Sequence, residues 1–416
     1  MFPLIFLLLA FVAAGFSQPQ PPPNYDESLV KPYTLPDPLT FSDGRKVKTA
    51  ADWTSKRRGE VLALFETQVY GRTPRTPPAK RFETLRTKQK ALGGTADWKE
   101  VRVWLKDGPD APYLDLLLIL PAGASKPVPV FLGISFGGNQ TITPDPDVRL
   151  STRWMRSRED GHRATEASRG SSATRWSVDQ IVKAGFGLAT FYYGDLFPDH
   201  TAGFKDSVIP HFSSGEPKPD DWNAIGAWAF GVSRAIDYLT TNPAVDAKRI
   251  SIIGHSRLGK TVLWAAAQDQ RVALTIANNS GEGGAALARR NFGETTAHLN
   301  KSFPHWFDGN FKQYSGAAEK LPVDQHMLIS LIAPRPVYLA SAAEDRWADP
   351  HGEFLAAKAS SPVYKLLGKD GFAATEMPAL HSPVMSTVGY HIRAGKHDVT
   401  AYDWEQFIAF ARRHLL

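Results

Sequence analysis

The feature that most constrains the fold is a regular alternation of short β-rich runs and helical stretches, which begins near residue 114. Strands are predicted at 113–120, 128–135, 186–193, 249–254, 273–277, 336–342 and 386–393. Helices are predicted at 174–184, 221–240, 260–268, 324–332 and 403–416. Because strands that alternate with helices form crossover units, the pattern predicts an α/β fold: a three-layer sandwich with a mostly parallel central sheet flanked by helices.

The length of 416 residues fits one large α/β domain with additions. We expect a signal peptide at 1–17, because its apolar run is shorter than the roughly 20 residues that span a bilayer and ends in small residues suited to cleavage. Residues 18–34, which begin with a Gln/Pro-rich stretch, are expected to be an extended tether, and 35–416 a single catalytic domain. The protein is therefore expected to be secreted or periplasmic, with no membrane association in its mature form.

Two segments of that domain fall outside the alternation. Residues 35–106 are expected to form an N-terminal layer packed on the sheet. Residues 139–172 form a polar, Arg-rich insertion between two predicted strands. Loops of this length are usually functional or mobile, so two interpretations stay open for the insertion: a solvated surface segment, or a lid that faces the substrate.

The composition excludes several classes of function. The chain has no cysteine, which rules out disulfides, Cys-ligated metals, Fe–S clusters and a Cys nucleophile. Its 48 Lys and Arg against 42 Asp and Glu are scattered, so nucleic acid is not an expected partner. No phosphate loop, metal-spaced His pair or cofactor motif is visible, so we expect no metal and no cofactor. We expect a monomer.

The candidate nucleophile is Ser256. A β-branched strand runs into Gly-His-Ser at 254–256, and a helix follows at once. Strand, sharp turn with Ser, then helix is the architecture of the nucleophile elbow of α/β-hydrolases. The usual G-x-S-x-G pattern has Gly at +2, where this chain has Leu258; its glycines are Gly254 at −2 and Gly259 at +3. The alternative is that Ser256 is an ordinary helix N-cap.

The residue after the candidate nucleophile supports a catalytic interpretation. A cation in the first turn of a helix, here Arg257, opposes the helix dipole at a cost of about 0.3–1 kcal/mol. Gly259 in the same turn costs up to about 1 kcal/mol relative to Ala. Stability alone would select neither residue, whereas a guanidinium beside Ser256 could stabilise the oxyanion of a tetrahedral intermediate. Lys260 lies within reach of a substrate in the same pocket.

The seven residues 254–260, GHSRLGK, resemble the G-C-S-R-x-G-K signature of the glucuronoyl esterases, carbohydrate esterase family fifteen. The resemblance extends from about Phe131 to the C-terminus. It implies an exported α/β-hydrolase that cleaves esters between 4-O-methyl-glucuronate on glucuronoxylan and lignin alcohols. His255 stands where the fungal members have Cys, so a disulfide at the elbow is absent here.

His397 is the predicted base. In α/β-hydrolases the histidine follows the last strand, in the chain order Ser, acid, His. His397 occupies that loop, between the predicted strand ending at residue 393 and the helix predicted from residue 403. The alternative base is His381, which we interpret as a loop histidine.

The acid has several candidates. The resemblance implies Glu in an E-S-G-x-G-G motif, but residues 279–284 read NSGEGG, so Asn279 holds that position and Glu282 lies three residues later. The same glycines match a dinucleotide fingerprint only weakly. The other position, after the next strand, offers Asp345 and Glu344, and we predict Asp345. Its carboxylate would orient His397 and stabilise the imidazolium.

The resemblance also implies a sugar pocket. Lys260, Glu294 and Trp347 match the family's glucuronate contacts, and His305 and Trp306 are predicted at the rim. The resulting prediction is an exported serine esterase that acts on glucuronate esters through an acyl-enzyme. The alternatives are an acetylxylan esterase or another carbohydrate carboxylesterase, and a polysaccharide-binding protein without activity.

Overall fold

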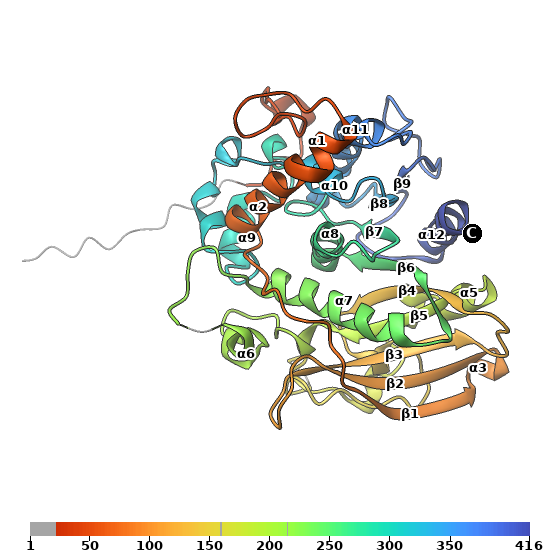
Figure 1. Cartoon of the computed structure of the whole chain (residues 1–416). Helices are drawn as coiled ribbons and strands as arrows, with labels where there is room; N and C mark the ends of the chain where they lie inside the picture. The colour runs from red at the N-terminus through yellow and green to blue at the C-terminus, as the bar shows by residue number, and fades with distance from the viewer. Residues whose placement is uncertain (1–21, 159, 214) are drawn as a thin grey trace, which may run out of the picture.

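The computed structural model describes residues 22–158, 160–213 and 215–416. A central sheet of nine strands has the order β1-β2-β3-β5-β4-β6-β7-β8-β9, and helices cover both of its faces (Figure 1). The strands are β1 (Phe82–Lys90), β2 (Ala96–Trp104), β3 (Tyr113–Pro121), β4 (Val128–Ser135), β5 (Gly187–Tyr192), β6 (Val245–His255), β7 (Leu274–Asn278), β8 (Val337–Ala342) and β9 (Val388–Arg393). The predicted signal peptide at 1–17 lies outside the described residues.

The sheet is parallel from β5 through β4 and β6 to β9, and antiparallel where β1, β2, β3 and β5 pair. The parallel strands are apolar and buried on both faces, as expected for strands covered by helices on each side. The predicted α/β fold with a mostly parallel sheet is therefore confirmed.

The α-helices form the two outer layers and the connections. They are α1 (Ala50–Asp52), α2 (Arg58–Gln68), α3 (Ala91–Gly94), α4 (Ala173–Trp176), α5 (Val178–Lys183), α6 (Ile209–Phe212), α7 (Ala224–Thr241), α8 (Arg257–Gln268), α9 (Thr296–Ser302), α10 (Gln325–Ser330), α11 (Pro350–Leu366) and α12 (Ala401–Leu415). One hydrophobic core joins the sheet to α2, α7, α8, α10 and α11, and the other joins its opposite face to α5 and α12. The helix predicted at 174–184 is interrupted at Ser177, whose φ of 41° divides it into α4 and α5.

The prediction for residues 35–106 is wrong in part. β1 and β2 are strands of the sheet itself and extend it beyond β3, instead of forming a layer on it. β1 has no fully buried residue, so its sequence lacks the apolar run by which the other strands were recognised. The expected layer exists only around α2, which buries Val61 and Phe65 against the core.

In its described part, residues 22–34, the predicted extended tether contacts the domain that follows it. The Gly293 amide donates to Asn24 O at 2.8 Å, and Arg290 Nη2 lies 2.7 Å from Glu27 Oε1. The ring of Tyr25 packs edge-on against Phe292. This segment is docked on the loop that precedes Glu294. Among the described residues, no helix is long and apolar enough to cross a membrane.

Candidate active site

The three predicted catalytic residues lie at the carboxyl ends of the parallel strands. Ser256 follows β6, Asp345 follows β8 and His397 follows β9. These strands are parallel neighbours in the order β6-β7-β8-β9, so their carboxyl ends meet at the same edge. The fold therefore brings together residues that are far apart in the sequence.

Ser256 has the strained backbone of a nucleophile elbow, with φ 57° and ψ −128°. The glycines at −2 and +3 are both required by close approaches. A Cβ on Gly254 would lie 2.0 Å from Leu258 O, and a Cβ on Gly259 would lie 2.9 Å from Ser280 Cβ. Leu258 can replace the usual glycine at +2 because its side chain points into the core.

His397 and Asp345 are in direct contact. Nδ1 of His397 lies 2.5 Å from Asp345 Oδ2, and the side-chain Nδ2 of Asn279 donates to the same oxygen at 2.8 Å. Burial raises the pKa of Asp345, but the hydrogen bond and charge of His397 together with the Asn279 amide outweigh it, so the pKa lies below its ordinary value. The carboxylate is thus ionised, and it leaves Nε2 of His397 as the free ring nitrogen.

Backbone pairing between two loops produces this contact. The amide of Ala343 donates to Arg393 O at 2.9 Å, and that of Glu344 to Gly395 O at 3.0 Å. The loop after β8 is therefore held against the loop that carries His397. The side chain of Asp345 is buried and contacts the imidazole, whereas Glu344 is exposed and, among the described residues, makes no hydrogen bond with it.

His255 packs against the imidazole of His397, with ring centroids 4.4 Å apart. The Asn278 side-chain amide lies 3.0 Å from Nδ1 of His255, which therefore accepts. Burial, and then the nearby charge of His397, hold the pKa of His255 well below its ordinary value. A neutral ring thus supports His397 at the position that holds Cys in the fungal signature.

Glu353 on α11 connects the loop that carries Asn279 to β8, the strand that precedes Asp345. Its Oε1 accepts from the Ser280 amide at 2.9 Å and the Gly281 amide at 3.0 Å, and its Oε2 accepts from Ser341 Oγ at 2.6 Å. The side chain is fully buried. Burial raises the pKa of Glu353 to about 7 against the lowering effect of these hydrogen bonds.

We expect Glu353→Gln to change how stability depends on pH. With a folded-state pKa of about 7 against an ordinary 4.5, the folded chain binds this proton more tightly, so Glu353 lowers the free energy of unfolding as the pH rises through that window. The oxygen of Gln can accept from the Ser280 and Gly281 amides and its Nε2 can donate to Ser341 Oγ, and the side chain does not titrate. Urea unfolding should therefore show the variant gaining about 3 kcal/mol on the wild type between pH 4.5 and 8. If the difference in the free energy of unfolding between the variant and the wild type were the same at pH 4.5 and pH 8, the prediction would be contradicted.

Arg257 lies on the other side of the elbow and is bound to a carboxylate that sequence analysis did not identify. Its Nη1 is paired with Oδ2 of the buried Asp199. The guanidinium carbon lies 4.5 Å from the ring centroid of Trp306 and 5.2 Å from that of Phe303. The arginine is therefore held in one orientation beside Ser256.

The predicted sugar contacts are also gathered near the elbow. Lys260 Nζ lies 3.3 Å from Glu294 Oε2 and donates to Ser280 O at 2.7 Å. The Glu294 amide donates to Trp347 O at 2.9 Å, so Trp347 adjoins this pair. Trp347 is 38% exposed, which leaves much of its indole open to a ligand.

His305 and Trp306, which were predicted at the rim of the sugar pocket, lie beside Arg257 and its partner Asp199. Nε2 of His305 and Nε1 of Trp306 lie 2.9 Å and 2.8 Å from Asp199 Oδ1. The ring centroid of Trp306 is also 6.0 Å from Lys260 Nζ, so this indole lies between the arginine and the lysine. The insertion reaches the same cluster, because Arg156 Nη1 is 3.8 Å from Asp199 Oδ2.

The remaining candidates are placed elsewhere. His381 packs on Tyr402, with ring centroids 4.6 Å apart, and accepts from the Ala394 amide at 3.3 Å. Glu282 is fully buried, and burial followed by the charges of Asp324 and Glu294 raises its pKa well above the ordinary value. In the part of the chain that the structure describes, neither residue hydrogen-bonds the triad.

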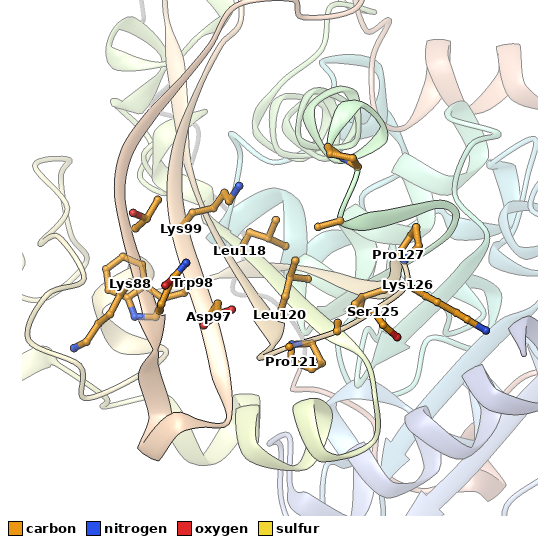
Figure 2. Close-up of a pocket in the computed structure, with 17 residues that line it drawn as sticks. Lys88, Asp97, Trp98, Lys99, Leu118, Leu120, Pro121, Ser125, Lys126 and Pro127 are labelled. Atoms are coloured by element: carbon orange, nitrogen blue, oxygen red, sulfur yellow. The ribbon is translucent and has the colours of Figure 1, made fainter.

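A cavity of about 650 Å³ lies near the start of β4, at the opposite ends of the parallel strands from the candidate site. Figure 2 shows the residues that line it. They include Leu118, Leu120, Pro121, Lys126 and Val128. Val128 begins β4, whereas the candidate site lies beyond the ends of the parallel strands, about one strand length of 25 Å away. No group of three His, Asp or Glu residues that could hold a metal ion occurs within 22–158, 160–213 and 215–416.

Three contributors to the site have weak signals in the sequence. Asn279 carries no charge, His255 stands out only as a replacement for Cys, and Asp199 belongs to no motif that sequence analysis identified. Asp199 follows β5, a parallel strand whose carboxyl end lies at the same edge as the elbow. A search for carboxylates just after predicted parallel strands could have found it.

Comparison with known proteins identifies the family. A family model described as glucuronyl esterase of fungi matches residues 217–368. A protein from an unknown prokaryotic organism named carbohydrate esterase MZ0003 is 48% identical over 398 residues, which are 94% of this chain and 92% of that protein. A 4-O-methyl-glucuronoyl methylesterase of Schizophyllum commune is 28% identical, over 80% of this chain and 74% of its own.

Solved structures agree with these relatives. The glucuronoyl esterase from Solibacter usitatus superposes with a TM-score of 0.89 at 50% identity, covering 94% of this chain and 100% of its own. A glucuronoyl esterase from Teredinibacter turnerae superposes with a TM-score of 0.77 at 34% identity, covering 92% and 89%. The chain therefore belongs to the glucuronoyl esterases of carbohydrate esterase family 15 and is a carboxylic ester hydrolase.

Proposed function

We propose that this enzyme is a secreted or periplasmic serine esterase that hydrolyses esters of (4-O-methyl-)glucuronic acid on glucuronoxylan with lignin alcohols. The observation that carries the proposal is the first turn of α8. It places Arg257 and Lys260 directly after Ser256, and Lys260 is paired with Glu294. A nucleophile, a cation for the oxyanion and a polar sugar contact thus lie within five consecutive residues.

Ser256 Oγ attacks the ester carbonyl while Nε2 of His397 accepts its proton. Asp345, 2.5 Å from Nδ1, holds the productive tautomer and stabilises the imidazolium. The imidazolium then protonates the leaving alcohol, and an acyl-enzyme remains. Water, deprotonated by His397, releases glucuronate and restores Ser256.

Two kinds of donor serve the oxyanion. The amide of Arg257 is the first of α8 and has no acceptor inside the helix, since the first amides of any helix lack one. In α/β-hydrolases the amide after the nucleophile is an oxyanion donor. The Arg257 guanidinium adds a positive charge, which a desolvated site makes more effective.

Arg257→Ala should lower kcat by about 10²–10³, because the guanidinium stabilises charge that exists only in the transition state. Steady-state kinetics on benzyl glucuronate measure the effect, with thermal unfolding as the check on folding. If only KM rises, Arg257 binds ground-state substrate and the assignment is wrong.

The sugar ring is proposed to lie between Lys260, Glu294 and Trp347. The ammonium and carboxylate can hydrogen-bond adjacent hydroxyls, and the partly exposed indole offers an apolar face and an N–H donor. Arg156 near Asp199 supports the interpretation that the Arg-rich insertion faces substrate.

A second candidate is a broader carbohydrate carboxylesterase, such as an acetylxylan esterase. It is favoured by one relative that is named a carbohydrate esterase, and by a 48% identical solved structure from a marine bacterial metagenome that is described as a promiscuous CE15 esterase. Comparing kcat/KM for benzyl glucuronate with acetate release from acetylated xylan separates the two. A preference for acetylated xylan would overturn the glucuronate proposal, and failure of a phosphonate to label Ser256 would overturn its assignment as the nucleophile.

A further inference from the structure

Asp199 is a buried carboxylate at the centre of a network outside the predicted triad. It lies in the segment that follows β5, and its side chain is 1% exposed. Oδ1 accepts from Nε1 of Trp306 at 2.8 Å and contacts Nε2 of His305 at 2.9 Å. Oδ2 is paired with Arg257 and lies 3.8 Å from Nη1 of Arg156.

The carboxylate keeps its charge in this buried position. Burial raises the pKa of Asp199, but hydrogen bonds from His305 and Trp306 and the charge of Arg257 outweigh it, so the pKa lies at about 2. Asp199 is therefore an anion throughout the pH range in which a histidine base works. A permanent anion next to Arg257 is a stable anchor for its guanidinium.

Asp199 occupies only one end of that guanidinium. Arg257 has donors at Nε, Nη1 and Nη2, and Asp199 takes Nη1. Over the described ranges, Nε is buried and has no hydrogen-bond partner. The rings of Phe303 and Trp306 lie near the guanidinium carbon, at 5.2 Å and 4.5 Å. One donor is thus anchored and the planar group is confined. The Arg257 side chain is 13% exposed, and Nη2, which makes no hydrogen bond among the described residues, is the donor left for a ligand.

We propose that Asp199 is a positioning residue that holds Arg257 ready to meet the oxyanion. The inference rests on the proposed function of Arg257. A free arginine has many rotamers, and ordering it during the reaction would cost part of what the guanidinium contributes. A donor that is already oriented requires no reorganisation when the negative charge develops. Asp199 then acts through Arg257 and does not itself touch the substrate.

A double-mutant cycle tests this coupling. Asp199→Asn alone should lower kcat on benzyl glucuronate by about 10–100-fold with little change in KM. In an Arg257→Ala background the same substitution should change kcat less than about threefold, because the group that it positions is gone. Rates are expressed per active site titrated with a phosphonate, so loss of folded protein does not contribute.

Asp195→Asn is the matched control. Asp195 is buried in the same segment, but it accepts from the Asp115 amide at 3.0 Å and, among the described residues, makes no hydrogen bond with Arg257. Asp195→Asn should leave kcat within about threefold of the wild type, and its effect should be the same in both backgrounds. Equal, additive losses from Asp199→Asn in the two backgrounds would overturn the proposal.

Guanidinium rescue provides a second test if Asp199→Asn does not fold alone because Arg257 is left unpaired. Arg257→Ala and the double variant Arg257→Ala/Asp199→Asn both lack that unpaired charge. Millimolar guanidinium chloride should raise kcat at least about tenfold in Arg257→Ala and less than about twofold in the double variant. Equal rescue would overturn the proposal. If the wild type hydrolyses phenyl acetate but not glucuronate esters, the substrate proposal fails, and the same cycle on phenyl acetate still decides the role of Asp199.

Discussion

Ser256→Ala is expected to abolish ester hydrolysis while the protein remains folded. Loss of the nucleophile of a serine hydrolase lowers kcat by about 10⁶-fold, since the histidine and acid cannot act without it. The substitution removes one half-buried hydroxyl and keeps the Cβ, so the elbow with φ 57° is unchanged. Hydrolysis of benzyl glucuronate and the thermal unfolding midpoint are the two measurements.

Ser251→Ala is the control for this variant. Ser251 lies on β6, the same strand that leads into the elbow, and its buried hydroxyl has no hydrogen-bond partner among the described residues. It should therefore retain activity. If Ser256→Ala kept more than a few per cent of the wild-type rate, another residue would have to be the nucleophile.

Asp345→Asn is expected to lower kcat by about 10⁴, because the imidazole of His397 loses both its productive tautomer and its counter-charge. The carboxylate oxygen in question lies 2.5 Å from Nδ1 of His397. Asn279 contacts the same oxygen but is neutral, so it cannot replace the charge. Measuring the rate of hydrolysis from about pH 5 to 9 distinguishes a variant that has lost its general base from one whose base works in a different pH range.

Three further variants locate the acid. Glu344→Gln and Glu282→Gln should cost much less, because Glu344 does not reach the imidazole and Glu282 is buried away from His397. The double variant Asp345→Asn with Asn279→Glu should recover part of the rate. Asn279 and His397 both contact Oδ2 of Asp345, so a carboxylate at position 279 would lie close to the imidazole. Near-normal activity in Asp345→Asn would refute the assignment, and a severe loss in Glu344→Gln would move the acid by one residue.

The predictable parts of this protein depend on local sequence. The parallel strands are continuous apolar runs because both of their faces are buried, and such runs can be recognised without knowing their neighbours. The elbow could be predicted for the same reason: a β-branched strand, two glycines and Ser256 specify a strained turn within a few residues. β1 escapes such recognition because it is an edge strand without a buried residue, and its pairing with β2 is what makes it a strand.

For the candidate site, the sequence could predict only which residues follow parallel strands and therefore lie at the same ends of those strands. The positions of Ser256 and His397 follow from the order of elements in an α/β-hydrolase, and the preference for Asp345 over Glu344 is an expectation that local sequence cannot test. The inward turn of Asp345 depends on two backbone hydrogen bonds between the loops after β8 and β9. No local pattern records such a pairing between loops on two different strands.

The sequence by itself determined the alternation of strands and helices, the elbow and the chemical groups available, since these depend on residues that are neighbours in the chain. The tertiary structure alone decided which groups meet. It joins Asp199 to Arg257 across 58 positions and Asn279 to Asp345 across 66. The physical reason is that a charge acts over a few ångströms, and distances of that size between remote residues exist only after the sheet and its loops have packed.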